Sequence, residues 1–268
     1  RVRDLDRIVC GCIARMNRNC KKRRLVRVLG VLAIAAIACS ESSERRAAAV
    51  AAWQADPTAE NVERIRGAIE DPDEWVRARA TRAWLSLSGA DASAVAIRAL
   101  SDPSAAVRSA AAVGAAEAGA REAAPELARV LIEDGDASVR REAAWALAAV
   151  GEPASVPALG AALDDPETPV RRAAARALAG LDAAGAIEAL ARRATEEPDW
   201  ETRTAIAAAL GRTGVPQAYL PLRAASSDPS AFVRAAAAAA LRSLRAAGVP
   251  ESEAVPEALA YGPAPPPE

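Results

Sequence analysis

The stretch "DPSAAVR" at residues 102–108 decides the fold, because the chain carries six versions of it. The five near-copies are "DPDEWVR" (71–77), "DGDASVR" (134–140), "DPETPVR" (165–171), "EPDWETR" (197–203) and "DPSAFVR" (228–234). Their final arginines follow one another at intervals of 31 or 32 residues. Regular spacing of this kind predicts a solenoid, in which each unit buries its apolar face only against its neighbours. The six units account for residues 58–248.

Each copy runs into the pattern of an amphipathic helix. Counted from the Arg, apolar residues stand at offsets −1, +3, +6, +7 and +10, which in the fourth unit are Val170, Ala174, Ala177, Leu178 and Leu181. At about 100° per residue these offsets share one face of a helix. Shorter first helices are expected at 123–131, 156–163 and 187–194. Glycines at 89, 119, 151, 180 and 248 are expected to end the second helices.

The composition favours closely packed helices and excludes several kinds of site. Alanine, the best helix former, supplies most of the apolar residues, whereas the chain has one Phe, two Tyr and one Met. We therefore expect an all-α fold. Histidine, the commonest general base and metal ligand, is absent. The cysteines Cys10, Cys12, Cys20 and Cys39 all precede the repeats, so no metal site is expected there.

The Asp-Pro and Val-Arg pairs have an expected structural use. Asp102, Asp165 and Asp228 are predicted to cap the second helices, and the following prolines suit the first helical position. The Val begins the buried face. The Arg lies on the flank of that face, where its long side chain can reach the next unit.

These features resemble a known family. Paired helices of about 31 residues with "D-P-x-x-V-R-x-A-A-x-A-L" are similar to HEAT repeats, specifically to the short HEAT-like type also found in phycobilisome lyases, and "DPETPVRRAAARALAGL" (165–181) carries the resemblance. It implies a right-handed α-solenoid of about six helical hairpins. It also implies an Asp-Arg ladder between units, made by Asp71, Arg77, Asp102, Arg108, Arg140, Asp165, Arg171, Arg203, Asp228 and Arg234. The resemblance says little about function, because the family serves scaffolds, lyase subunits, hydroxylases and DNA-repair enzymes.

The fifth unit departs from the pattern. Glu197 replaces the Asp, and Thr202 replaces the Val. We expect a weaker cap and less apolar packing there, which makes units five and six the predicted place for a bend.

The outward side of each second helix is where a binding site is expected. Offsets +1, +5 and +8 point away from the core and, by the HEAT resemblance, line the concave surface. They predict a basic and aromatic patch made by Arg82, Arg141, Trp145, Arg172 and Arg176. Trp and Arg are enriched at interaction hot spots, so one interpretation is a groove for a protein or an acidic peptide segment. The other is a solvated helix face on which Trp145 packs against arginine stems.

The N-terminal region resembles a bacterial lipoprotein signal. After Met16, a Lys and Arg cluster precedes an apolar run at 28–38, which is too short for a comfortable membrane span but suits a signal peptide. Small residues then lead to Cys39, the predicted lipidation site. We therefore predict an upstream segment at 1–15, a signal peptide at 16–38, and a lipidated tether with a capping helix at 39–57.

Charge and the C-terminal segment bear on the partners. Residues 1–38 hold ten Lys and Arg against two Asp, which leaves the remainder about nine charges negative and disfavours nucleic acid as a partner. Residues 249–268 form a Pro-rich tail, which suits either a mobile end or a polyproline II ligand.

No catalytic constellation is expected, and no cofactor. The HEAT-like hydroxylases hold iron with His-Glu pairs, which a chain without His cannot supply. The predicted function is a lipid-anchored HEAT-repeat scaffold in the bacterial cell envelope, membrane-anchored and facing the periplasm or exterior. The alternatives are a noncatalytic subunit or activator of an enzyme complex, and a bilin-lyase-like enzyme.

Overall fold

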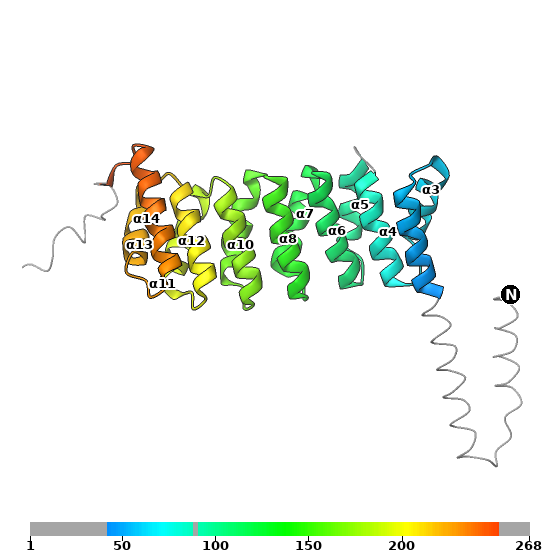
Figure 1. Cartoon of the computed structure of the whole chain (residues 1–268), viewed down its shortest axis with the longest axis horizontal. Coiled ribbons are helices and arrows are strands. Elements are labelled where there is room, and N and C mark those ends of the chain that lie inside the picture. Colours follow the sequence, from blue (N-terminus) through cyan, green and yellow to red (C-terminus); the bar gives the residue numbers. More distant parts are fainter. Residues whose placement is uncertain (1–41, 88–90, 252–268) are drawn as a thin grey trace, which may run out of the picture. The chain divides into compact units, whose positions relative to one another are not determined.

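The computed structural model describes residues 42–87 and 91–251 (Figure 1). The chain divides into two compact units, Arg1–Arg46 and Ala47–Glu268. In the first unit the described residues 42–46 are helical, and Arg46 donates a hydrogen bond to Ser42. The second unit holds the repeats.

Helical hairpins form the second unit, and its described residues contain no strand. The chain pairs each first helix with a longer second helix, in the order α3 (Ala59–Ala68) and α4 (Glu74–Leu87), α5 (Ala92–Ala99) and α6 (Ala105–Ala118), α7 (Ala124–Glu133) and α8 (Ala137–Val150), α9 (Val156–Ala161) and α10 (Thr168–Gly180), α11 (Ile187–Glu196) and α12 (Trp200–Arg212), α13 (Tyr219–Ala225) and α14 (Ala231–Ala246). The predicted all-α array of six hairpins is thus confirmed.

The second helices α4, α6, α8, α10, α12 and α14 lie side by side in chain order (Figure 1). Between them and the first helices runs a continuous core of Leu, Val and Ala side chains, among which Leu147, Leu178 and Leu210 are fully buried. Alanine allows the second helices to approach closely. At Gly114 and Gly211 even a methyl group would be too large, because a Cβ there would lie 2.5 Å from Leu85 and 2.6 Å from Ala240.

The first hairpin has its own small core. Val50, in the helical segment 47–55, packs with Ile65, Val76, Ala80 and Ala83, and the ring of Trp84 lies against this cluster. Trp84 holds the +7 position that Leu occupies in the last four units.

The helix starts differ from the prediction. Helix α6 begins at Ala105 with Ser104 as its N-cap, so Asp102 lies two residues before the cap and Pro103 lies outside the helix. The carboxylate of Asp102 instead accepts a hydrogen bond from the backbone N–H of Ser104 at 2.8 Å. Where a side chain does cap a second helix, the carboxylate two residues further on supplies it, as at Asp73, Asp136 and Asp199.

The helix ends follow the prediction in part. Gly119 and Gly151 adopt left-handed backbone angles after α6 and α8, with φ of 63° and 74°. Gly180 does not, because α10 runs through it to a C-cap at Leu181. The prediction that Gly180 ends its helix in this way was therefore wrong.

The fifth unit is better packed at its start than the sequence suggests. Thr202 is fully buried, and its hydroxyl donates to the carboxylate of Asp199 at 2.6 Å. Asp199 also accepts from the backbone N–H of Thr202, so α12 has a side-chain cap. The expected weak cap is therefore wrong, because the capping carboxylate belongs to Asp199 and not to Glu197.

Candidate functional site

Arginine side chains join the consecutive units. In the first five units, the Arg at the end of the repeated motif donates from Nε and Nη2 to both oxygens of a carboxylate in the next unit. These pairs are Arg77–Asp102, Arg108–Asp134, Arg140–Asp165, Arg171–Glu197 and Arg203–Asp228. The N···O distances lie between 2.6 and 3.1 Å, as expected for charge-assisted bidentate pairs.

The same arginines also hold their own turns. Nη1 of Arg108 donates to the backbone carbonyl oxygens of Asp102 and Pro103 at 2.9 and 3.1 Å. Arg234, in the last unit, makes the equivalent bonds to Asp228 and Pro229. In the first five units the guanidinium of the motif Arg thus donates hydrogen bonds both to its own turn and to the next unit. This arrangement is a structural joint rather than a ligand site.

Contacts within the joints lower the pKa values of Asp102, Asp134, Glu197 and Asp228. For Glu197, burial alone would raise the pKa, but hydrogen bonds from Arg171, from the N–H of Asp199 and from Arg193 outweigh it and hold the pKa below 4.5. For Asp228 the hydrogen bond from Arg203 is the largest influence and lowers the pKa below 3.8. These carboxylates are therefore ionised at neutral pH.

A groove on the second-helix face contains most of the predicted binding residues. Arg141 and Trp145 from α8 and Arg172 and Arg176 from α10 line a depression of about 470 Å³. Its floor is made by small residues, Ala148, Ala173 and Ala177, and Pro169 borders it. The Trp145 side chain is 47% exposed. The structure thus brings together four of the five residues, and we call this depression the Trp145 groove.

Carboxylates offset the positive charge of the Trp145 groove. Arg141 pairs with Glu142, and Arg176 lies 3.5 Å from Glu201. Arg172 binds Asp199 at 3.0 Å and Glu201 at 2.6 Å. Counting outward offsets from the motif did not reveal these acids, because two of them belong to the neighbouring unit.

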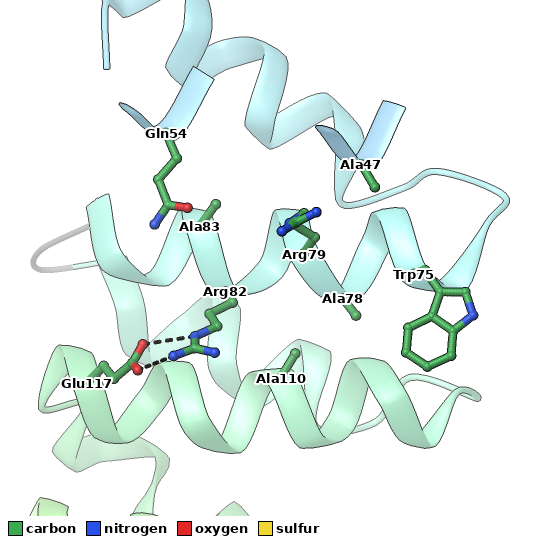
Figure 2. A pocket seen from close by; sticks show the side chains of 9 residues that line it. All are labelled: Ala47, Gln54, Trp75, Ala78, Arg79, Arg82, Ala83, Ala110 and Glu117. Carbon is green, nitrogen blue, oxygen red and sulfur yellow. Dashed lines mark hydrogen bonds and ion pairs between the residues drawn. The ribbon is translucent and has the colours of Figure 1, made fainter. Parts of the chain in front are cut away.

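Arg82 lies in a different pocket, between α4, α6 and the helical segment 47–55 (Figure 2). This pocket encloses about 590 Å³. Arg82 donates to Glu117 of α6, which closes one end, and Trp75 stands at the other end with 66% of its side chain exposed. The lining is completed by Ala47, Gln54, Ala78, Arg79, Ala83 and Ala110. We call it the Trp75 pocket.

Arg79 is a functional candidate that the predicted patch did not include. It stands one helical turn after Trp75 on α4, between that ring and the Arg82–Glu117 pair (Figure 2). It is exposed, and among the described residues it forms no ion pair or hydrogen bond. Its offset from the motif Arg is +2, whereas the predicted outward offsets are +1, +5 and +8. The sequence does contain a signal for Arg79: four of the other units have Ala at offset +2, where the first unit has Arg.

Several predicted features lie outside the described residues. They are Cys39, the segments 1–15 and 16–38, Gly89, and the tail from residue 252 onward. Within residues 42–87 and 91–251, no helix has the length and apolar character needed to cross a membrane. The same residues bring together no group of three side chains suited to holding a metal ion.

Comparison with known proteins finds a matching family and similar solved structures. A family model described as HEAT repeats matches residues 92–173 and 156–242, more than half of the chain. No curated protein matches this chain. A chain of the complex of CpcE and CpcF of phycocyanin lyase from Nostoc sp. PCC7120 is similar, with 28% identity, a TM-score of 0.51 and coverage of 57% of this chain. The chain spans 64% of the length of that lyase chain.

An engineered protein and a designed armadillo repeat protein are similar in fold. An engineered protein matches with 22% identity and a TM-score of 0.55, covering 70% of this chain and 98% of its own. A designed armadillo repeat protein in complex with peptide (KR)4 matches with 20% identity and a TM-score of 0.53, covering 67% and 98%. Together with the HEAT-repeat match, the similarity to the armadillo repeat protein shows that the hairpins stack as a repeat solenoid.

Proposed function

This chain belongs to the HEAT-repeat family, and from that premise we propose that it is a noncatalytic scaffold that binds an extended segment of a partner protein along its second-helix face. Repeat solenoids of this kind present long surfaces, and they use them for protein or peptide partners.

The distribution of exposed aromatic side chains carries the proposal. Among the described residues, Trp75, Trp145, Trp200 and Phe232 are the exposed aromatics, and all four lie on second helices. The exposed large aliphatics Ile97, Ile132 and Leu220 lie instead on first helices.

Two of the aromatics stand beside hollows with alanine floors. Trp145 borders the Trp145 groove, and Trp75 borders the Trp75 pocket. Small residues leave room for a partner side chain, and an exposed Trp offers a large contact area at low entropic cost. An extended segment crossing the second helices would place side chains in both hollows.

Selection from a phage-displayed peptide library on the detergent-solubilised full chain tests this proposal. We expect peptides whose affinity falls by about tenfold or more in Trp145→Ala, the loss typical of a hot-spot residue. Ile132→Ala, on the first-helix side, removes an exposed apolar residue of similar exposure and should leave binding unchanged. Peptides that bind both variants equally well would contradict the proposal.

A second candidate is a noncatalytic subunit of an enzyme complex. The similarity to the CpcE and CpcF complex of a phycocyanin lyase favours it, and a lyase-like enzyme is the further alternative from the same similarity. Purification of the chain with its native partner separates these functions. A single enzyme whose rate rises on addition of the chain would support the subunit, whereas bilin transfer by the chain alone would support the lyase.

We also propose that the chain is anchored by lipid at Cys39 in the bacterial cell envelope. The order of segments before Cys39 supports the lipid anchor, because a basic cluster, an apolar run and small residues precede the cysteine in turn. More than one acyl chain on that residue would give stable anchoring. Metabolic labelling with a fatty-acid analogue should mark the wild type and not Cys39→Ala, and equal labelling of both would refute the anchor.

A further inference from the structure

The Trp75 pocket offers a feature that the Trp145 groove lacks, an arginine without a carboxylate partner among the described residues. We propose that this pocket recognises an acidic side chain of the bound segment, with Arg79 binding its carboxylate and Trp75 contacting the apolar residue beside it. The inference rests on the proposed function and assigns the partner chemistry of one position on that face.

The charge balance around Arg79 favours an anionic ligand. In the Trp145 groove, Arg141, Arg172 and Arg176 each have a carboxylate within 3.5 Å. In the Trp75 pocket, Glu117 is already bound by Arg82 through Nε at 3.2 Å and through Nη2. Among the described residues, Arg79 therefore has no carboxylate that compensates its positive charge. A guanidinium in that state selects a planar anion that accepts two hydrogen bonds.

The chain itself shows which anion an arginine prefers in this fold. Five motif arginines bind carboxylates through two parallel hydrogen bonds, for example Arg203 with Asp228 at 2.7 and 3.0 Å. The part of the chain after residue 38 is about nine charges negative, which disfavours extended polyanions such as nucleic acids. A single carboxylate on a protein segment therefore suits the one Arg79 guanidinium better than a phosphate backbone does.

The remaining lining supplies the apolar contact. Ala78 and Ala110 form a floor between Trp75 and Arg79, and Figure 2 shows both methyl groups in the space between α4 and α6. Trp75 lies one helical turn from Arg79, so an acidic residue and its apolar neighbour can reach both at once. The volume of about 590 Å³ accommodates two side chains.

Three nine-residue peptide libraries test the inference on the solubilised full chain, with Glu, Gln or Lys fixed at the centre and the other positions randomised. We expect the Glu library to bind about tenfold or more above the Gln library, the difference typical of a hydrogen bond to a charged group. Arg79→Gln should reduce that difference to about twofold or less. Arg79→Glu should reverse the preference towards Lys.

Arg212 provides the matched control. It is an exposed arginine on α12, outside both hollows, and among the described residues it makes no ion pair. Arg212→Gln should leave the preference for Glu intact. Circular dichroism of Arg79→Gln should be that of the wild type, since the side chain contributes no bond to the described part of the fold.

The outcomes separate the inference from the proposed function. Binding that depends on Trp145 but is equal for the Glu and Gln libraries would overturn the carboxylate assignment and leave the scaffold proposal standing. A preference for Glu that survives Arg79→Gln would also overturn the assignment to this residue. Failure of all three libraries to bind in a Trp145-dependent way would overturn both.

Discussion

Arg171 binds Glu197 through two hydrogen bonds, of 2.8 and 3.1 Å, and the Glu197 side chain is fully buried. The Arg171 side chain is only 7% exposed. Arg193 donates a further hydrogen bond to Glu197 at 3.0 Å. The joint between the fourth and fifth units is therefore the most deeply buried of the five arginine pairs. The Asp to Glu replacement in the motif gives the longer side chain that serves two arginines.

Removal of the Glu197 carboxylate should destabilise the fold more than the same change in an outer joint. Glu197→Ala leaves a buried guanidinium unpaired, which costs about 3–5 kcal/mol. Asp102→Ala should cost less, since both members of the Arg77–Asp102 pair are 16% exposed and water can replace the lost bonds. Urea denaturation followed by circular dichroism measures both. Equal losses would show that burial does not set the strength of the joints.

The stability should depend on pH through the lowered pKa values of the joint carboxylates Glu197 and Asp228. Because the folded pKa of Asp228 lies below 3.8, the unfolded chain takes up a proton at higher pH than the folded chain. The stabilisation that ionised Asp228 contributes is complete at pH values above the ordinary pKa of an Asp. It is lost as the pH falls through the lower pKa that Asp228 has in the folded chain. The free energy of unfolding should thus decline as the pH falls below about 5, where Glu197 begins to protonate in the unfolded state while its lowered pKa keeps it ionised in the folded state.

Asp228→Asn provides the control for this dependence. The variant should be less stable than the wild type at pH 7, and the difference between the two should shrink as the pH falls towards 2. A difference that stays constant across this range would exclude the carboxylate as its source.

Gly211 should not tolerate a side chain. A Cβ at this position would lie 2.6 Å from Cβ and 2.8 Å from Cα of Ala240, so α12 and α14 would have to move apart. We expect Gly211→Ala to cost about 1–3 kcal/mol. Gly67, inside α3, has no atom within 4 Å of the added methyl, and Gly67→Ala should instead stabilise by about 0.5 kcal/mol. Thermal unfolding of the two variants compares them, and a stable Gly211→Ala would show that the helices can separate easily.

The stacked rings of Trp200 and Phe232 should couple α12 and α14. Their centroids are 5.0 Å apart with an interplanar angle of 28°. A double-mutant cycle with Trp200→Ala and Phe232→Ala should give a coupling of about 0.5–1.5 kcal/mol. Additive losses within about 0.3 kcal/mol would mean that the rings are only neighbours.

The helix register was accessible from the sequence, but the role of the turn acid was only partly so. Spacing alone identified Asp102 as belonging to the start of α6. Spacing could not show that the helix begins only at Ala105. Asp102 lies before the N-cap, and its carboxylate binds Arg77 of the preceding unit. The bond between them spans 25 residues, beyond the reach of any local capping rule.

The binding face shows the same division. Trp145 and Arg176 share the +5 offset, and their meeting in one groove follows from the repeat length. The neutralising acid Glu201 comes from the next unit, at an offset not expected to face outward. That Arg79 has no carboxylate partner in the described part of the chain likewise depends on its surroundings in the stack, and a single-helix projection contains no such information.

The sequence by itself determined the number of units, their all-α character and the buried face of each second helix, because these properties repeat every 31 or 32 residues and are local to one hairpin. Only the tertiary structure decided where charge is balanced. Ion pairs such as Arg171–Glu197 and Arg172–Asp199 form between units, so their existence depends on distances across the stack. The surface charge of a repeat protein is therefore set by how neighbouring units meet, and that leaves Arg79 free of the described carboxylates while its neighbour Arg82 is paired.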